Sequence, residues 1–177
     1  KRHRDREAII CGDVRWTYAE FADVVDLLAG GLRSAGIEAG DRVALIARNS
    51  HAFLAVRFAV ARADAILVPI NFMLNAADVA YILDHSGARL LFADATTIEV
   101  ALEARQPCVE KIYGIPTEAG ATPAQVPSWE GLLAADRPPP AMRGGEDILQ
   151  IIYTSGTESR PKGAMLSHNA VLWEYQS

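Results

Sequence analysis

Apolar and polar positions along the chain follow two repeating patterns. Short continuous apolar runs, typical of strands buried on both faces of a sheet, are separated by stretches with apolar residues at helical spacing. This alternation predicts an α/β fold, with a doubly wound, mostly parallel sheet flanked by helices and joined by right-handed crossovers. The expected strands are residues 42–47, 65–68, 90–92, 111–115 and 148–153, and the expected helices are residues 17–36, 50–63, 76–86 and 98–104.

Turn and capping residues mark the ends of several of these elements. Gly12-Asp13, between two short apolar runs, predicts a hairpin at the start of the chain. Thr17, followed by Glu20 three positions later, has the form of a capping box, and Asn75 is placed to cap the third helix. Pro69 is expected to end the second strand, because proline donates no hydrogen bond to a sheet.

The segment 116–145 differs from the rest of the chain in composition. Pro, Gly and Ala dominate it, and the run 138–140 consists of prolines, which fit neither a helix nor an inner strand. We therefore expect a surface excursion within the domain. Trp129 is expected to hold this excursion to the body through a short helix over residues 129–134.

Charge and cysteine usage narrow the class of protein. Lys and Arg total 17 against 22 Asp and Glu, a formal net charge of -5, so the basic face of a nucleic-acid-binding protein is not expected. Arg57, Arg62 and Asp64 interrupt the longest apolar stretch before it reaches the roughly 18 residues of a membrane span. We expect a cytoplasmic protein in which Cys11 and Cys108, which lack metal-binding spacing, are reduced core thiols.

The candidate chemistry follows the last predicted strand. Thr154 opens a run of small, hydroxyl-bearing and glycine residues that ends at Gly163, and Ser167 is placed to cap a helix behind it. Such loops bind phosphates, because short side chains let backbone N–H groups turn inward and a lysine adds positive charge. A Walker A loop is disfavoured, since Pro161 precedes Lys162 and a glycine follows it. Composition alone also permits an ordinary polar turn.

The run from residue 153 to residue 163 resembles the signature loop of the adenylate-forming superfamily, which includes acyl-CoA synthetases, luciferases and peptide-synthetase adenylation domains. The usual form of that loop is Tyr-Thr-Ser-Gly-Thr/Ser-Thr-Gly-x-Pro-Lys-Gly. Further blocks resemble the family in the same order along nearly the whole chain. They are Trp16–Glu20, Gly40–Ala44, Val68–Asn71 and Tyr81–Asp84.

The resemblance implies a carboxylate–CoA ligase, with a fatty acid as the expected carboxylate, ATP, Mg²⁺ and CoA as the other reactants and ions, and an acyl-adenylate as intermediate. Lys162 is the candidate catalytic residue, which would pair with a phosphate oxygen or brace the loop. No metal ligand is assigned, although Thr154 could help to order Mg²⁺. The candidate nucleotide-binding residues are Thr154, Ser155, Gly156, Thr157, Glu158, Ser159 and Lys162.

Two of these positions depart from the family pattern. Glu158 replaces a threonine and Ser159 replaces a glycine, so a carboxylate is placed beside the expected phosphates and a position of free backbone rotation is lost. We expect Glu158 to face solvent or a cation. These substitutions leave open a non-catalytic nucleotide-binding module built on the same fold.

The resemblance also sets expectations for the whole protein. Members of the superfamily continue for several hundred residues and carry further motifs there, so residues 1–177 are expected to be part of a large N-terminal domain that turns over nothing alone. The thiol acceptor is CoA or, in an acyl-AMP ligase or adenylation domain, a carrier protein. His168 is expected to pack or cap, and Arg42, Arg48 and Arg57 to be surface or helix-face charges.

Overall fold

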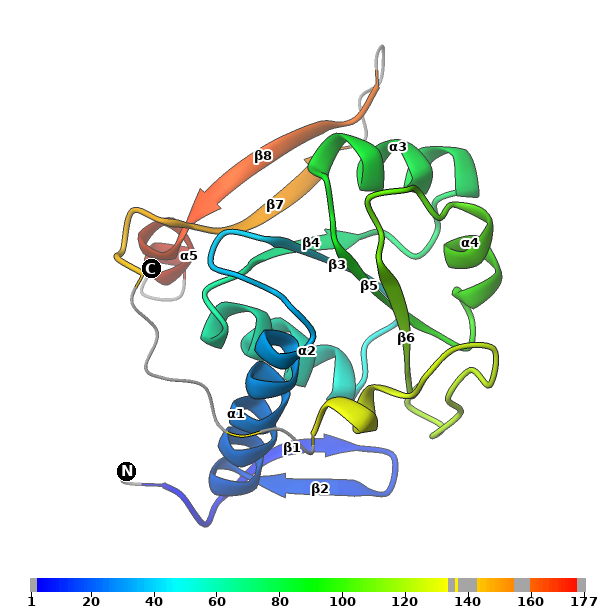
Figure 1. The fold of residues 1–177 in the computed structure, drawn as a ribbon. Helices are drawn as coiled ribbons and strands as arrows, with labels where there is room; N and C mark the ends of the chain where they lie inside the picture. The colour runs from blue at the N-terminus through cyan, green and yellow to red at the C-terminus, as the bar shows by residue number, and fades with distance from the viewer. Residues whose placement is uncertain (1–2, 134–135, 137–142, 155–159, 175–177) are drawn as a thin grey trace.

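A computed structural model describes residues 3–133, 136, 143–154 and 160–174. A six-stranded sheet forms the centre of these residues, with the strand order β6-β5-β3-β4-β7-β8 (Figure 1). Neighbouring strands are parallel except for β8, which runs antiparallel to β7. The strands are β1 Glu7–Cys11, β2 Val14–Thr17, β3 Arg42–Ile46, β4 Ile66–Ile70, β5 Leu90–Asp94, β6 Lys111–Ile115, β7 Ile148–Thr154 and β8 Lys162–Ser167; the helices are α1 Tyr18–Ser34, α2 His51–Arg62, α3 Ala76–Ser86, α4 Ile98–Glu103, the 3₁₀ helix η1 Trp129–Leu132 and α5 His168–Glu174.

Helices cover both faces of this sheet, as the apolar runs predict. Alternate strand residues point to opposite faces, so β3 contributes Val43 and Leu45 to one core and Ala44 and Ile46 to the other. The first core is closed by α1, α2 and η1, and the second by α3 and α4 (Figure 1). The predicted doubly wound, mostly parallel α/β fold is therefore confirmed.

The predicted turns and caps are confirmed where short-range chemistry dictates them. β1 and β2 form an antiparallel hairpin. The Thr17 side chain accepts a hydrogen bond from the Glu20 N–H while the Glu20 carboxylate accepts one from the Thr17 N–H, which completes the capping box of α1. Asn75 caps α3 by accepting from the Asp78 N–H at 3.0 Å, and Gly87 ends that helix in the left-handed conformation, at φ 62°.

Two predictions about strands are wrong. β4 does not stop at Pro69 but continues to Ile70, with Pro69 opposite Leu45 of β3. The proline is tolerated because Leu67 and Gln150 form the single register pair between β4 and β7, so the ladder on that side has ended before Pro69. In addition, the loop after β7 does not lead directly into a helix, because residues 162–167 form strand β8.

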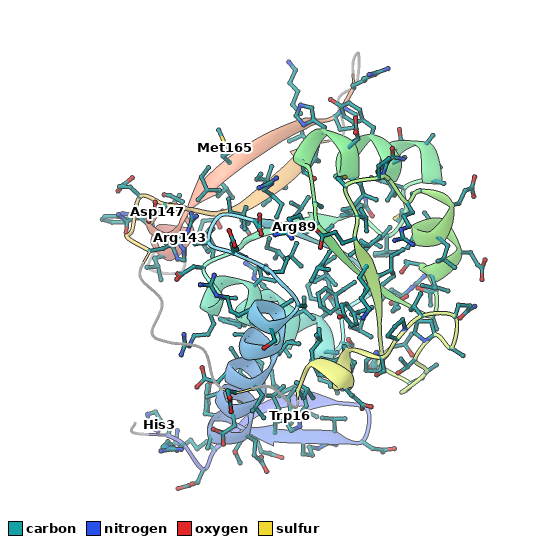
Figure 2. The ribbon with its side chains drawn as sticks, viewed as in Figure 1. His3, Trp16, Arg89, Arg143, Asp147 and Met165 are labelled. Carbon is teal, nitrogen blue, oxygen red and sulfur yellow. The ribbon has the colours of Figure 1, made fainter. Side chains whose placement is uncertain are left out.

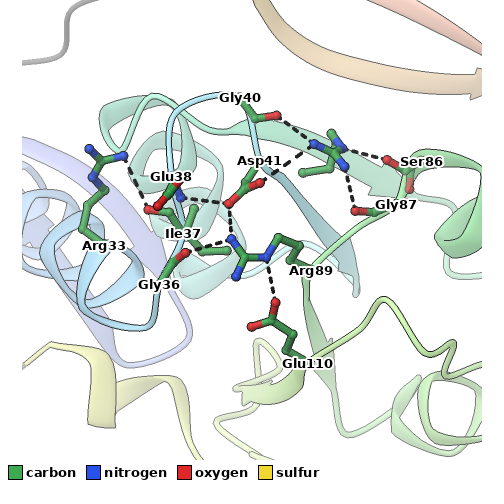
Figure 3. Close-up of polar contacts among 11 residues, drawn as sticks. Arg33, Gly36, Ile37, Glu38, Gly40, Asp41, Ser86, Gly87, Arg89 and Glu110 are labelled. Atoms are coloured by element: carbon green, nitrogen blue, oxygen red, sulfur yellow. Dashed lines mark hydrogen bonds and ion pairs between the residues drawn. The ribbon is translucent and has the colours of Figure 1, made fainter.

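Ionic and polar contacts join the amino-terminal ends of the parallel strands β3, β5 and β6 to one another (Figure 3). The Arg89 guanidinium is paired with the Asp41 carboxylate and donates to the Glu110 carboxylate at 2.7 Å. Arg42 donates to the carbonyls of Ser86 and Gly87, at 2.7 and 3.0 Å. The expectation that Arg42 is a surface charge is therefore corrected, since its half-buried guanidinium joins β3 to the end of α3.

The segment after β6 returns across the face that α1 and α2 cover. Trp129, at the start of η1, is 3% exposed, so it does hold this segment to the body as predicted. η1 ends at Leu132, and residue 134, the predicted end of this helix, lies outside the described residues. Cys11 and Cys108 are free, partly buried thiols. Among the described residues, no helix is long and apolar enough to span a membrane.

Candidate functional site

The β7–β8 hairpin brings two of the candidate residues together. Thr154, the last residue of β7, and Lys162, the first residue of β8, are register partners across the antiparallel ladder. Both are exposed, so the hydroxyl and the ammonium group are accessible to a ligand at the mouth of the hairpin. The other candidate positions, Ser155, Gly156, Thr157, Glu158 and Ser159, lie outside the described residues.

A cavity of about 150 Å³ adjoins the mouth of this hairpin. It lies at the carboxyl ends of β4 and β7, which is the edge where open α/β sheets bind ligands. Pockets for drug-sized ligands measure about 300–1,000 Å³, so this cavity fits one small group such as a phosphate and not a whole nucleotide. Its lining residues are Pro69, Ile70, Asn71, Leu74, Ile82, Tyr153, Thr154 and Pro161.

Tyr153 lies directly beneath the mouth of the hairpin. Its hydroxyl is hydrogen-bonded to Nδ1 of His85 on α3 at 2.7 Å, and the two rings meet edge to face with centroids 5.8 Å apart. Burial raises the pKa of Tyr153, so its hydroxyl keeps its proton at neutral pH. Its register partner is Gly163, where a Cβ atom would lie 3.1 Å from Cζ of the tyrosine and 2.8 Å from Ile151. The glycine therefore makes room for the tyrosine ring.

The positive charges at the hairpin have different surroundings. The Arg160 guanidinium carbon lies 5.3 Å from the centre of the Tyr81 ring on α3, a cation–π contact. Lys162 is exposed beside Thr154, its register partner across the hairpin. In the described part of the chain, no three His, Cys, Asp or Glu side chains gather to bind a metal.

Asp94, at the end of β5, is a carboxylate on the same edge of the sheet but plays a different part. It is fully buried and accepts hydrogen bonds from the backbone N–H groups of Arg48 and Thr96, both at 2.8 Å, and of Thr97 at 3.1 Å. With its oxygens satisfied by these donors, Asp94 ties the loop after β3 to the loop after β5.

His168 and Arg57 lie away from the hairpin mouth. Both line an apolar cavity of about 260 Å³ that also contacts Phe58, Gln150 and Leu172. The Ser167 hydroxyl accepts from the N–H of residue 170, as predicted for the cap of α5. Met165 points outward from β8 (Figure 2) and is 66% exposed.

The structure adds Tyr81 and His85 to the candidate site, which the sequence did not assign to it. Tyr81 belongs to a block that carried the family resemblance, and four positions separate it from His85, so both lie on one face of α3. The helical spacing of two aromatic rings was an available signal. Nothing in the sequence, however, placed that face of α3 beside β7.

Comparisons with known proteins decide the family. A model of the family described as "AMP-binding enzyme" matches residues 1–177. The chain belongs to this family. Feruloyl-CoA synthase from Amycolatopsis sp. is 36% identical to it over 166 residues, which cover 94% of the chain and 31% of that relative. Long-chain-fatty-acid–CoA ligase FadD13 from Mycobacterium tuberculosis is 36% identical over 167 residues, covering 90% of the chain and 31% of that ligase.

Solved structures of CoA ligases have the same fold. A benzoate CoA ligase from Burkholderia xenovorans LB400 matches 99% of this chain with a TM-score of 0.86 and 24% identity, and 34% of that protein is covered. The chain thus spans about a third of the length of the relatives and structures that it matches.

Proposed function

We propose that the protein carrying this chain is an AMP-forming acid–thiol ligase, and that residues 1–177 are part of its large N-terminal domain. The observation that carries this proposal is the match to the AMP-binding family over all 177 residues, together with Thr154 and Lys162 facing each other at the mouth of the β7–β8 hairpin. Two relatives at 36% identity are named as a CoA synthase and a CoA ligase, which supports a thiol acceptor, for which we propose CoA.

The proposed reaction has two steps. A carboxylate oxygen attacks the α-phosphorus of ATP, and the bond to the β-phosphate bridge breaks to release pyrophosphate and leave an acyl-adenylate. The thiol sulfur then attacks the acyl carbon, which expels AMP and gives a thioester and a proton. Negative charge shifts onto pyrophosphate in the first step, so fixed positive charge and hydrogen-bond donors beside the β- and γ-phosphates favour its release.

We assign each candidate residue a proposed role. Lys162 would neutralise charge on the phosphates, and the Thr154 hydroxyl would donate to a phosphate oxygen or help to order Mg²⁺, because both groups are exposed at the same edge. The positions Ser155 to Ser159 would supply N–H and hydroxyl donors between them. Within that run, Glu158 would face solvent or the metal ion, since a carboxylate repels phosphate.

For the carboxylate we propose a fatty acid. FadD13 is named for long-chain fatty acids and feruloyl-CoA synthase for an aromatic acid, at equal identity. We also propose that the protein acts in the cytoplasm, and that residues 1–177 do not turn over substrate by themselves.

The proposed function is tested by carboxylate-dependent exchange of pyrophosphate into ATP, measured on the complete gene product with a panel of fatty and aromatic acids. We expect exchange with at least one fatty acid. Lys162→Ala should lower its rate about 100-fold, the usual scale for one electrostatic contact to a developing charge, and Lys162→Arg should retain more activity. Lys111→Ala is the matched control, because Lys111 lies over the Tyr113 ring on β6, far along the sheet from β7.

One outcome would contradict the role of Lys162, and another would contradict the ligase. Exchange that survives Lys162→Ala would remove Lys162 from the reaction. MgATP binding without exchange on any acid would favour the non-catalytic nucleotide-binding module, which the unusual Glu158-Ser159 pair in this loop supports. Residues 1–177 expressed alone, assayed in parallel, should show no exchange.

A further inference from the structure

We propose that helix α3 is the positioning element of the nucleotide site, and that His85 and Tyr81 hold the two ends of the β7–β8 hairpin mouth in register for phosphate binding. This inference rests on the proposed function, because it assigns a role in the same reaction to residues that do not touch the substrate.

The first contact fixes the β7 end of the mouth. Tyr153 immediately precedes Thr154, and its hydroxyl is bound to His85 Nδ1 at 2.7 Å. Successive residues of a strand point to opposite faces, so the orientation of Tyr153 sets the orientation of Thr154. The ring of His85 also lies against that of Tyr81, with centroids 5.4 Å apart, which limits how His85 itself can turn.

The second contact fixes the other end of the mouth. Arg160 lies over the Tyr81 ring, with its guanidinium carbon 5.3 Å from the ring centre, and two residues later comes Lys162. Tyr81 and His85 are one helical turn apart, so a single face of α3 contacts both chain segments that enter and leave the loop. The two chain segments that flank the loop are therefore both positioned by one helix.

Helix α3 is itself firmly placed, which is what a positioning element needs. Val79, Ile82 and Leu83 are fully buried in the second core. The last turn is held by Arg42, whose guanidinium donates to two carbonyls at the end of the helix. A shift of α3 would therefore break contacts with β3 as well as with the core. The helix backbone that carries the rings of Tyr81 and His85 is thus held in place.

Gly163 completes the arrangement. The Tyr153 ring occupies the space in which a side chain of residue 163 would stand, since a Cβ atom there would approach Cζ of the ring to 3.1 Å. The glycine that follows the lysine in this loop is thus matched to the tyrosine that precedes the threonine. Together they let the ring cross from β7 to α3 without pushing Lys162 away from Thr154.

The test uses the complete gene product and separates the Michaelis constants of the two substrates. Tyr153→Phe and His85→Ala should each raise the KM for MgATP about fivefold, the loss expected for one hydrogen bond, and leave the KM for the carboxylate within about twofold. The double variant should be no worse than either single variant, because both remove the same contact. His85→Asn, which keeps a polar atom near the position of Nδ1, should restore most of the affinity.

A control and a second readout distinguish this inference from the proposed function. Asp84→Ala changes the neighbouring exposed residue of α3 and should leave both KM values unchanged. Additive losses in the double variant, or a His85→Asn variant as weak as His85→Ala, would overturn the inference, as would equal changes in both KM values. If the wild-type protein shows no exchange, the ligase fails instead, and calorimetric MgATP affinities of the same variants decide the role of α3. Unchanged affinities, or no MgATP binding at all, would overturn it.

Discussion

Asp41 and Arg42 are adjacent at the start of β3, and their side chains contact different neighbours at the amino-terminal ends of the strands. The Asp41 carboxylate accepts from the Glu38 N–H at 2.9 Å and pairs with Arg89, while Arg42 reaches the end of α3. Hydrogen bonding to the carboxylates of Glu110 and Asp41 raises the pKa of Arg89. The Gly-Asp-Arg block that supported the family resemblance therefore stabilises the fold. It lies at the amino-terminal ends of the strands, opposite the carboxyl-terminal ends where the hairpin mouth is.

The Asp41 contacts predict a measurable loss of stability. Asp41→Ala removes one backbone hydrogen bond and two ion pairs, the close one with Arg89 and a longer one with Arg42 at 4.0 Å, from a carboxylate that is 17% exposed, so the free energy of unfolding should fall by about 1–3 kcal/mol. Urea denaturation of the protein measures this change. Asp84→Ala, at an exposed position, should stay within about 0.5 kcal/mol of wild type. An equally small effect at Asp41 would show that the network contributes nothing net.

At the scale of elements, the sequence predicts the bounds of a helix or strand best where residues close in the sequence determine them. α3 spans residues 76–86 as predicted, because Asn75 supplies the cap and Gly87 the left-handed end. β8 was missed, since Lys162–Ser167 has neither β-branched residues nor an alternation of apolar and polar positions, and its pairing with β7 alone makes it a strand. The contact between α3 and Tyr153 depends on another pairing, that of β7 with β4, whose partners are much further apart in the sequence.

Packing between α1 and η1 predicts the effect of a single methyl group. A Cβ atom at Gly31 would lie 2.1 Å from the Leu132 carbonyl oxygen. Alanine is favoured over glycine in a helix interior by up to about 1 kcal/mol. The clash outweighs this preference, because moving a packed backbone segment costs about 1–3 kcal/mol.

Gly31→Ala should therefore destabilise the protein by about 1–2 kcal/mol in urea denaturation, although helix propensity alone favours alanine. Gly131→Ala is the matched control, because no heavy atom lies within 4 Å of its Cβ position. A stabilised Gly31→Ala variant would mean that η1 moves freely away from α1.

At the scale of the whole molecule, strand order is the feature that the sequence could not provide. The alternation of elements predicts a doubly wound sheet, but not that β7 joins β4 or that β3 lies between β4 and β5. Which strands lie side by side depends on how the helices can cover the apolar faces of all strands at once, and this is a property of the whole fold. For this reason the sequence could name Thr154 and Lys162 as candidates within one loop but could not place α3 beside them, and the role of these two residues stays a prediction.

His51 joins three parts of the molecule and predicts how stability depends on pH. It begins α2, contacts Trp16 of the hairpin with centroids 5.0 Å apart, and contacts Trp129 of η1 at 6.2 Å. Burial lowers the pKa of His51 below its ordinary value of 6.5, and the nearby Glu130 carboxylate opposes this in part. The unfolded chain therefore binds a proton at a higher pH than the folded chain, and protonation favours unfolding.

Stability should consequently fall as the pH drops below about 6.5, and part of this fall should disappear in His51→Phe. Urea denaturation at pH 7.5, 6.5 and 5.5 measures the slope for both proteins. His3→Ala removes an exposed histidine and should leave the slope as in wild type. A wild-type slope in His51→Phe would assign the pH dependence to other groups.

The position of β7 also has a consequence for how the protein is made. β4 lies inside the sheet, yet its neighbour β7 is separated from it by residues 71–147. A ribosome adds about 5–20 residues per second, so β4 waits on the order of ten seconds with one backbone edge unpaired. Exposed strand edges of this kind are templates for aggregation. The nascent chain should therefore need a chaperone most during synthesis of residues 71–147, and clustered slow codons in that segment should lower the soluble yield.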